Sequence, residues 1–231
     1  MQIAGVEKNS FIDYPGKIAA VVFTLGCNLN CGYCHNRGLL LSSEWLRTEI
    51  LNEEVLDFLK GRRTFIEGIV ISGGEPTIWP DLQEFISRLK EMGYPVKLDT
   101  NGTNPILLKK LISEKMIDYV AMDIKAPFGK YSMICNAHVN LEDIKTSIDI
   151  LLDLSEEIEY QFRTTLIPDL TLGDIDIIVK QIRNSKRHIL QKFRDHKDDY
   201  PKDMLNDHYQ YVSNSNLYRK LSDGVSYNEN V

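Results

Sequence analysis

Three of the four cysteines lie within eight consecutive positions, at Cys27, Cys31 and Cys34 of the stretch LGCNLNCGYCHN. Three clustered cysteines and one isolated cysteine make a poor disulfide framework. In a reducing compartment such a cluster is typical of metal or redox chemistry. The fourth cysteine, Cys135, stands alone and is expected to behave as a small buried apolar residue. The three clustered cysteines therefore predict a metal or redox site.

Three kinds of centre could use these thiolates. A structural zinc site needs four ligands, and His35 is a poor fourth one because neighbours such as Cys34 and His35 rarely both reach one ion. The run CGYCH also matches covalent c-type haem attachment, but it leaves Cys27 unexplained and no export signal precedes it. The third candidate is a [4Fe–4S] cluster on three thiolates, which leaves one iron without a protein ligand. We favour the cluster and keep a non-catalytic zinc-binding module as an alternative.

The elements around the cysteines alternate between strand and helix. Helical patterns run from Pro80 to Gly93 and from the cap Asn104 onwards, and further helices are expected to start at Ser43, Asn140 and Leu172. This alternation requires right-handed crossovers and a mostly parallel sheet. A full eight-unit barrel takes about 250 residues, so we expect an α/β fold, a partial (β/α)6 barrel of the TIM type. The expected strands are 18–25, 68–72, 94–100, 117–124 and 159–167, with 187–190 as a sixth.

The chain is predicted to divide into a barrel over residues 1–190 and a polar C-terminal tail or extension over 191–231, rich in Asn, Ser, Asp and Tyr. The net charge of -6 and the pI near 5.4 argue against a nucleic-acid partner. The sequence has no apolar run long enough for a membrane span and no signal-peptide pattern at its start. We therefore expect a cytoplasmic protein with no membrane association.

A polar or glycine-rich motif accompanies each of the first five strands. The cysteine cluster follows the first strand, and the later strands lead to SGGEP, DTNG, DIKAP and FRTT. The C-terminal ends of parallel barrel strands share one rim, where active sites are built. These motifs are therefore expected to meet at one mouth.

The arrangement resembles the radical S-adenosylmethionine (SAM) superfamily, whose C-x3-C-x2-C pattern stands here as CNLNCGYC. The resemblance covers residues 12 to about 190 and implies a [4Fe–4S] cluster on Cys27, Cys31 and Cys34, with SAM bound to the open iron. It implies that the GGE segment, Gly73, Gly74 and Glu75, meets the amino end of SAM through main-chain groups. Glycines would let the backbone approach a ligand closely.

The same resemblance gives roles to the remaining motif residues. Tyr33 would lie near the adenine, Asp99 and Asp123 would accept bonds from the ammonium or ribose hydroxyls, and Lys125 would pair with the carboxylate. Arg163 would be a cation for SAM or for the partner, with a structural ion pair as its alternative. Asn101 is a further site candidate, which could instead cap a turn. Cofactor-binding residues on this interpretation are Tyr33, Gly73, Gly74, Glu75, Asp99, Asn101, Asp123, Lys125 and Arg163.

A narrower resemblance is to activating proteins of glycyl-radical enzymes, in the long form that serves anaerobic ribonucleoside-triphosphate reductase. It implies that SAM is cleaved to a 5′-deoxyadenosyl radical, which removes a hydrogen atom from a glycine of the partner enzyme. It also implies a flavodoxin or ferredoxin-type electron donor. The alternative within the superfamily is a small-molecule enzyme such as 7-carboxy-7-deazaguanine synthase.

Overall fold

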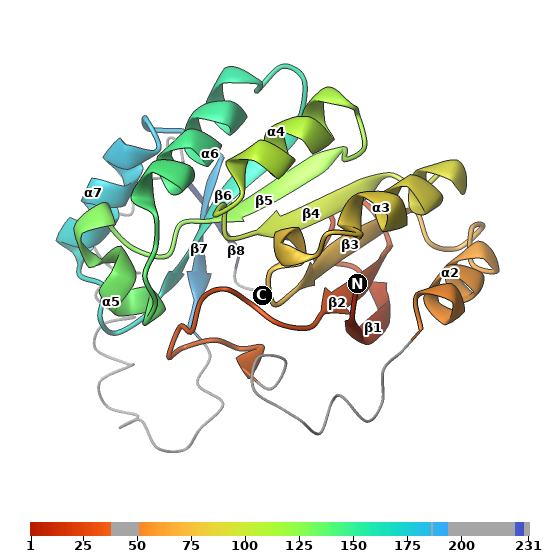
Figure 1. Cartoon of the computed structure of the whole chain (residues 1–231). Coiled ribbons are helices and arrows are strands. Elements are labelled where there is room, and N and C mark those ends of the chain that lie inside the picture. The colour runs from red at the N-terminus through yellow and green to blue at the C-terminus, as the bar shows by residue number, and fades with distance from the viewer. Residues whose placement is uncertain (38–50, 186, 194–224, 229–231) are drawn as a thin grey trace.

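The computed structural model describes residues 1–37, 51–185 and 187–193, together with the backbone of strand 225–228. These residues form one curved sheet of eight strands in the order β1-β2-β3-β4-β5-β6-β7-β8 (Figure 1). Six neighbouring strands, β2 to β7, are parallel, as the strand–helix alternation predicts for a partial (β/α)6 barrel. Their bounds are Ala19–Thr24, Gly68–Gly73, Val96–Thr100, Tyr119–Asp123, Glu159–Leu166 and His188–Lys192.

Both edges of the sheet carry a strand that the sequence did not predict. Strand β1 (Ile3–Ser10) pairs antiparallel with β2, and β8 (Val225–Asn228) pairs parallel with β7. The tail is otherwise outside the described residues. Because β7 runs to Lys192, the proposed boundary after residue 190 falls inside a strand, and the division into barrel and tail stays a prediction.

The helices lie along the outer side of the sheet (Figure 1). Asn104 caps α4 by accepting the Leu107 N–H at 3.2 Å, as predicted. The helix expected at Pro80 instead begins at Leu82, because the Leu82 N–H bonds back to the Trp79 carbonyl and places Pro80 in a turn. The helix expected from Ser43 falls outside the described residues. The helices are α2 (Asn52–Lys60), α3 (Leu82–Glu91), α4 (Pro105–Ser113), α5 (Tyr131–Cys135), α6 (Leu141–Asp153) and α7 (Leu172–Gln181), with short 3-10 turns at Pro76–Ile78 and Phe128–Lys130.

The alternation of side chains along each strand separates a core from a lumen. On β4, Val96 and Leu98 join the main apolar cluster under the helices, whereas Lys97 and Asp99 face the opposite side. The lower part of the lumen is filled by a second apolar cluster around Tyr14, Val21 and Val70. The upper part is polar and holds the site described below. Among the described residues no helix is long and apolar enough to span a bilayer.

Candidate functional site

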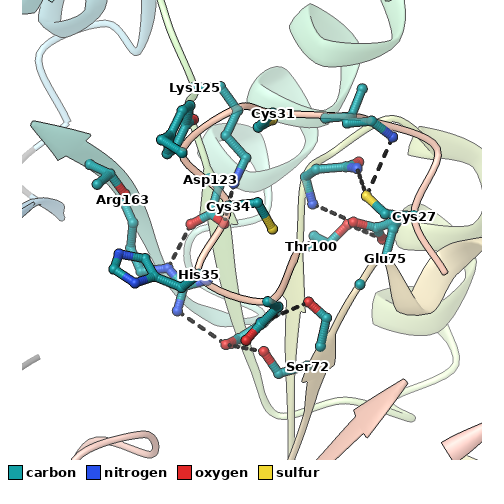
Figure 2. A pocket seen from close by; sticks show the side chains of 18 of the residues that line it. Cys27, Cys31, Cys34, His35, Ser72, Glu75, Thr100, Asp123, Lys125 and Arg163 are labelled. Atoms are coloured by element: carbon teal, nitrogen blue, oxygen red, sulfur yellow. Dashed lines mark hydrogen bonds and ion pairs between the residues drawn. The ribbon is translucent and has the colours of Figure 1, made fainter. Parts of the chain in front are cut away.

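One cavity of about 260 Å³ opens at the C-terminal ends of the parallel strands. All the residues selected from the sequence line it: the three cysteines, Tyr33, Gly73, Gly74, Glu75, Asp99, Asn101, Asp123, Lys125 and Arg163. They come from the loop after β2 and from the ends of β3, β4, β5 and β6, so the expected meeting of the motifs at one rim is what the structure has (Figure 2). Cys135 is fully buried and is not part of the lining.

The cysteine loop is held against the C-terminal end of α5. The Asn30 N–H donates to the carbonyl of Cys135 at 3.0 Å, and the thiol of Cys135 hydrogen-bonds the Cys31 sulfur, which lowers the pKa of Cys31. Burial raises the pKa of Cys27 to about 11 and also raises that of Cys34. Within the described residues, no three His, Cys, Asp or Glu side chains are grouped around a single-ion position.

Gly73 and Gly74 are required by chain packing. A Cβ on Gly74 would lie 1.7 Å from the Gly26 carbonyl oxygen, and one on Gly73, where φ is +108°, would lie 2.4 Å from the Thr24 nitrogen. The Gly74 N–H bonds the Thr24 carbonyl at 2.9 Å, so this amide is already used within the chain. The two glycines therefore bring the end of β3 against the chain that leads into Cys27.

Glu75 is a buried acceptor that joins two loops. Its carboxylate accepts hydrogen bonds from the Thr77 N–H and hydroxyl at 3.1 and 2.6 Å, from the Thr100 hydroxyl at 2.8 Å and from the Asn101 N–H at 2.7 Å. Burial raises the pKa of Glu75, and these donors act against that shift. Glu75 is 1% exposed, and its own N–H donates to the Gly26 carbonyl at 2.9 Å. Glu75 therefore positions its neighbours.

Asn101 connects the cysteine loop to the strand ends. Its amide nitrogen donates to Asn28 Oδ1 at 2.9 Å and lies 3.9 Å from the sulfur of Cys27, while its oxygen accepts the Thr103 N–H at 3.0 Å. The turn-capping role that was the alternative for Asn101 is therefore present. The same side chain also lines the cavity.

Below the cysteines, five charged side chains alternate in sign across three strands. The Lys97 ammonium pairs with Asp99, Arg163 bridges Asp99 at 3.1 Å and Asp123 at 2.8 Å, and Lys125 pairs with Asp123 at 2.8 Å. Figure 2 shows Lys125 and Arg163 converging on Asp123 beside Cys34. Arg163 is thus held in the structural ion pair that was its alternative role, at a position that also lines the cavity.

The balance of charges sets the protonation states of these five side chains. Burial alone would raise the pKa of Asp123, but Arg163 and Lys125 lower it to about 2. Burial would likewise lower the pKa of Lys125, yet Asp123, Tyr33 and Cys31 keep it above its ordinary value. Both groups therefore stay ionised at neutral pH, and a cation stands next to the cysteine thiols.

Several residues of the site were not selected from the sequence. Lys97 was missed because a lysine in a strand usually marks a surface position; its spacing of two from Asp99, on the same face, was the available signal. The Asp99 carboxylate also accepts the Ser72 hydroxyl at 3.0 Å. Other lining residues outside the prediction are Asp13, Phe23, Leu29, His35, Asn36, Ser72, Thr100, Thr165 and Gln191.

Comparison with known families decides between the kinds of centre considered above. The model of the radical SAM superfamily matches residues 21–182, a span that includes the cysteine loop and the four later motifs. The chain belongs to the radical SAM superfamily. Proteins of this superfamily bind a [4Fe–4S] cluster and S-adenosylmethionine, so the zinc and haem alternatives no longer apply.

Two relatives indicate the branch of the superfamily. The chain is 40% identical over 214 residues to the putative glycyl-radical enzyme activating enzyme MJ1227 of Methanocaldococcus jannaschii, covering 90% of this chain and 84% of that protein. It is 34% identical over 129 residues to the pyruvate formate-lyase-activating enzyme of Staphylococcus aureus (strain USA300), covering 52% of this chain and 51% of that protein. The protein is thus a radical SAM enzyme with homologues among activating enzymes.

The fold matches solved structures over most of the chain. Streptococcus suis SuiB bound to S-adenosylmethionine superposes with a TM-score of 0.62 at 14% identity, covering 88% of this chain. The chain spans about half the length of SuiB, with 44% of that chain covered. At this identity the likeness concerns the fold alone.

The donor set of the cavity fits both ligands of the superfamily. Three thiols on one loop face a cavity that also carries a cation, Lys125, and thiolates are the normal ligands of iron–sulfur clusters. The carboxylates and cations at the strand ends suit the ammonium and carboxylate of an amino acid. Tyr33 also lines a second cavity of about 260 Å³, whose lining includes Ile167 and Phe193.

Proposed function

We propose that this protein is an activating enzyme that generates a glycyl radical on a partner enzyme. The observation that carries the proposal is the assembly in one cavity of the three cysteines and the charged ends of β4, β5 and β6. The family relationship to activating enzymes supports it over the 214 aligned residues. The cluster and SAM, when bound, supply a one-electron cleavage to methionine and a 5′-deoxyadenosyl radical.

The residues of the chain then have separate tasks. Cys27, Cys31 and Cys34 hold the cluster, and Asn101 and Cys135 orient two of these cysteines through the contacts described above. We assign to the Lys125 ammonium the pairing with the methionyl carboxylate, which its position in the cavity lining supports.

Asp123 and Tyr33 are assigned to other parts of SAM. Asp123 has acceptor sites left for the ammonium or ribose hydroxyls, because its two oxygens each receive one cationic donor. We assign to Tyr33 a position near the adenine, and its place in the lining of both cavities supports this assignment.

For the partner we propose anaerobic ribonucleoside-triphosphate reductase, with a flavodoxin or ferredoxin-type protein as electron donor. The support is the agreement of five motifs with the long activating form: FIDYPGKIAAVVFTLGCNLNCGYCHN, SGGEPT, LDTNGTNP, DIKAP and FRTT. This partner assignment is finer than the family relationship and needs its own test.

The test uses protein purified without oxygen, reconstituted with iron and sulfide and reduced with dithionite. We expect cleavage of SAM to 5′-deoxyadenosine and methionine, and a glycyl-radical doublet in the EPR spectrum when the reductase is added. Cleavage without a doublet would reject this partner and direct the search to other glycyl-radical enzymes or to a small substrate. If reconstituted protein with full iron content cleaves no SAM, the enzymatic proposal fails.

A further inference from the structure

Lys97 is a lysine inside the barrel. It is 1% exposed, and the strand register places it beside Val70 of β3 and Tyr119 of β5, in the layer that closes the lower lumen. Its Nζ lies 6.0 Å from the centre of the Tyr119 ring. A buried ammonium is costly unless it is paired, so this position calls for an explanation beyond packing.

The partner of Lys97 is one particular oxygen of Asp99. Lys97 Nζ donates to Oδ1, while Oδ2 accepts the Ser72 hydroxyl at 3.0 Å and Arg163 Nη1 at 3.1 Å. Lys97 does not line the cavity, whereas the other three residues do. The hydrogen-bonded route from Lys97 to the cavity therefore passes through Asp99.

We infer that Lys97 is a positioning residue: it holds Oδ1 of Asp99 so that Oδ2 faces Arg163, and Arg163 in turn holds Asp123 opposite Lys125. This inference rests on the proposed binding of SAM in the cavity. It adds to that function a residue outside the cavity that sets the orientation of the charged side chains lining it. Removal of Lys97 frees the Asp99 carboxylate to rotate and to compete with Asp123 for the Arg163 guanidinium.

The cysteine loop does not depend on this arrangement. Its hydrogen bonds to other segments include those to Asn101, Thr103, the Gly73 carbonyl and the Cys135 carbonyl. The hydrogen bond of the Lys97 side chain goes to Asp99. Loss of Lys97 should therefore weaken SAM binding while the iron content stays unchanged. That separation distinguishes a positioning residue from one whose loss merely unfolds the barrel.

The experiment is a double-mutant cycle on the full-length, cluster-loaded protein. SAM dissociation constants are measured by equilibrium dialysis for wild type, Lys97→Met, Asp99→Asn and the double variant, with iron content and thermal midpoint for each. Lys97→Met should weaken SAM binding about tenfold. The double variant should match Asp99→Asn, because both substitutions act through one carboxylate and their effects do not multiply. The matched control is Lys90→Met, whose ion pair with Asp118 lies at the partly exposed outer surface, and it should bind SAM as wild type does.

The outcomes distinguish a failure of the inference about Lys97 from a failure of the proposed function. If wild type binds SAM and Lys97→Met binds it equally well, or if the double variant binds SAM more weakly than Asp99→Asn by the full factor measured for Lys97→Met, the inference about Lys97 is overturned and the proposed function stands. If loaded wild type binds no SAM, the proposed function fails first. Should Lys97→Met not fold, the double variant, which buries no unpaired charge, is compared with Asp99→Asn alone, and weaker binding by the double variant overturns the inference.

Discussion

The backbone N–H of Asn101 donates to the buried carboxylate of Glu75 at 2.7 Å, which joins the loop after β3 to the loop after β4. Because Asn101 also contacts the cysteine loop through Asn28, this bond connects the sheet to the residues that precede the second cysteine. Glu75 is therefore a structural centre of the site, although it was selected from the sequence as a residue of the SAM-binding segment.

We predict that Glu75→Gln lowers the free energy of unfolding by about 2 kcal/mol, because the amide turns one NH₂ group toward donors that need an acceptor. Urea unfolding of the full-length chain measures this. Glu84→Gln, at an exposed position of α3, is the control and should change stability by less than about 0.5 kcal/mol. Equal stability of the two variants would show that the four donors do not depend on the charge of Glu75.

Gly74 tests the close packing below the cysteine loop. In Gly74→Ala the new Cβ would overlap the Gly26 carbonyl, with 1.7 Å between the atoms, so the chain leading into Cys27 must move. We expect a loss of about 3 kcal/mol in the free energy of unfolding and a lower iron content after reconstitution. Gly5→Ala is the matched control, since its Cβ would meet nothing within 4 Å. An unaffected Gly74→Ala would mean that the loop can shift at little cost.

The four cysteines provide an internal comparison. Cys27→Ala, Cys31→Ala and Cys34→Ala should each lose the ability to cleave SAM, because each removes a ligand of the cluster. Cys135→Ala should keep its iron, since Cys135 lies outside the cavity and the variant retains the backbone carbonyl that accepts the Asn30 N–H. Iron and sulfide analysis together with the 5′-deoxyadenosine assay measure both properties. Full turnover with an intact cluster in any of the first three variants would remove that cysteine from the ligand set.

The sequence was sufficient to select the motif residues of the cavity lining, but not the hydrogen bonds and ion pairs among them. The cysteines, Asp99 and Asp123 could be selected because motifs at successive strand ends must meet in a parallel barrel. Lys97 could not, since its burial depends on the curvature of the sheet, which places it 6.0 Å from the centre of the Tyr119 ring of the neighbouring strand. Strand β1 was missed for a similar reason: its exposed central residues give IAGVEKNS no clear strand pattern, and it is fixed by pairing with β2.

Asp123 makes the stability of the chain depend on pH in the acid range. Its pKa is about 2 in the folded chain and 3.8 ordinarily, so its contribution is present above pH 3.8 and is lost as the pH falls toward 2. The contribution is about 1 to 2 kcal/mol, since the carboxylate is one quarter exposed. In Asp123→Asn this part of the acid dependence should disappear. Urea unfolding of the iron-free chain between pH 4 and pH 2 measures it, and parallel curves for the two proteins would contradict the assignment.

A substitution of Lys125 is expected to weaken the binding of SAM but not that of the cluster. Its ammonium pairs with Asp123 but donates no hydrogen bond to a cysteine, so Lys125→Ala should leave the iron content unchanged. SAM affinity should fall by about tenfold to a hundredfold, because a charge-assisted bond to the methionyl carboxylate is worth about 1.5 to 3 kcal/mol. Lys145→Ala, whose pair with Glu142 is exposed on α6, is the control and should keep wild-type affinity. Unchanged affinity in Lys125→Ala, with iron fully retained, would remove Lys125 from the SAM site and leave it as the ion-pair partner of Asp123.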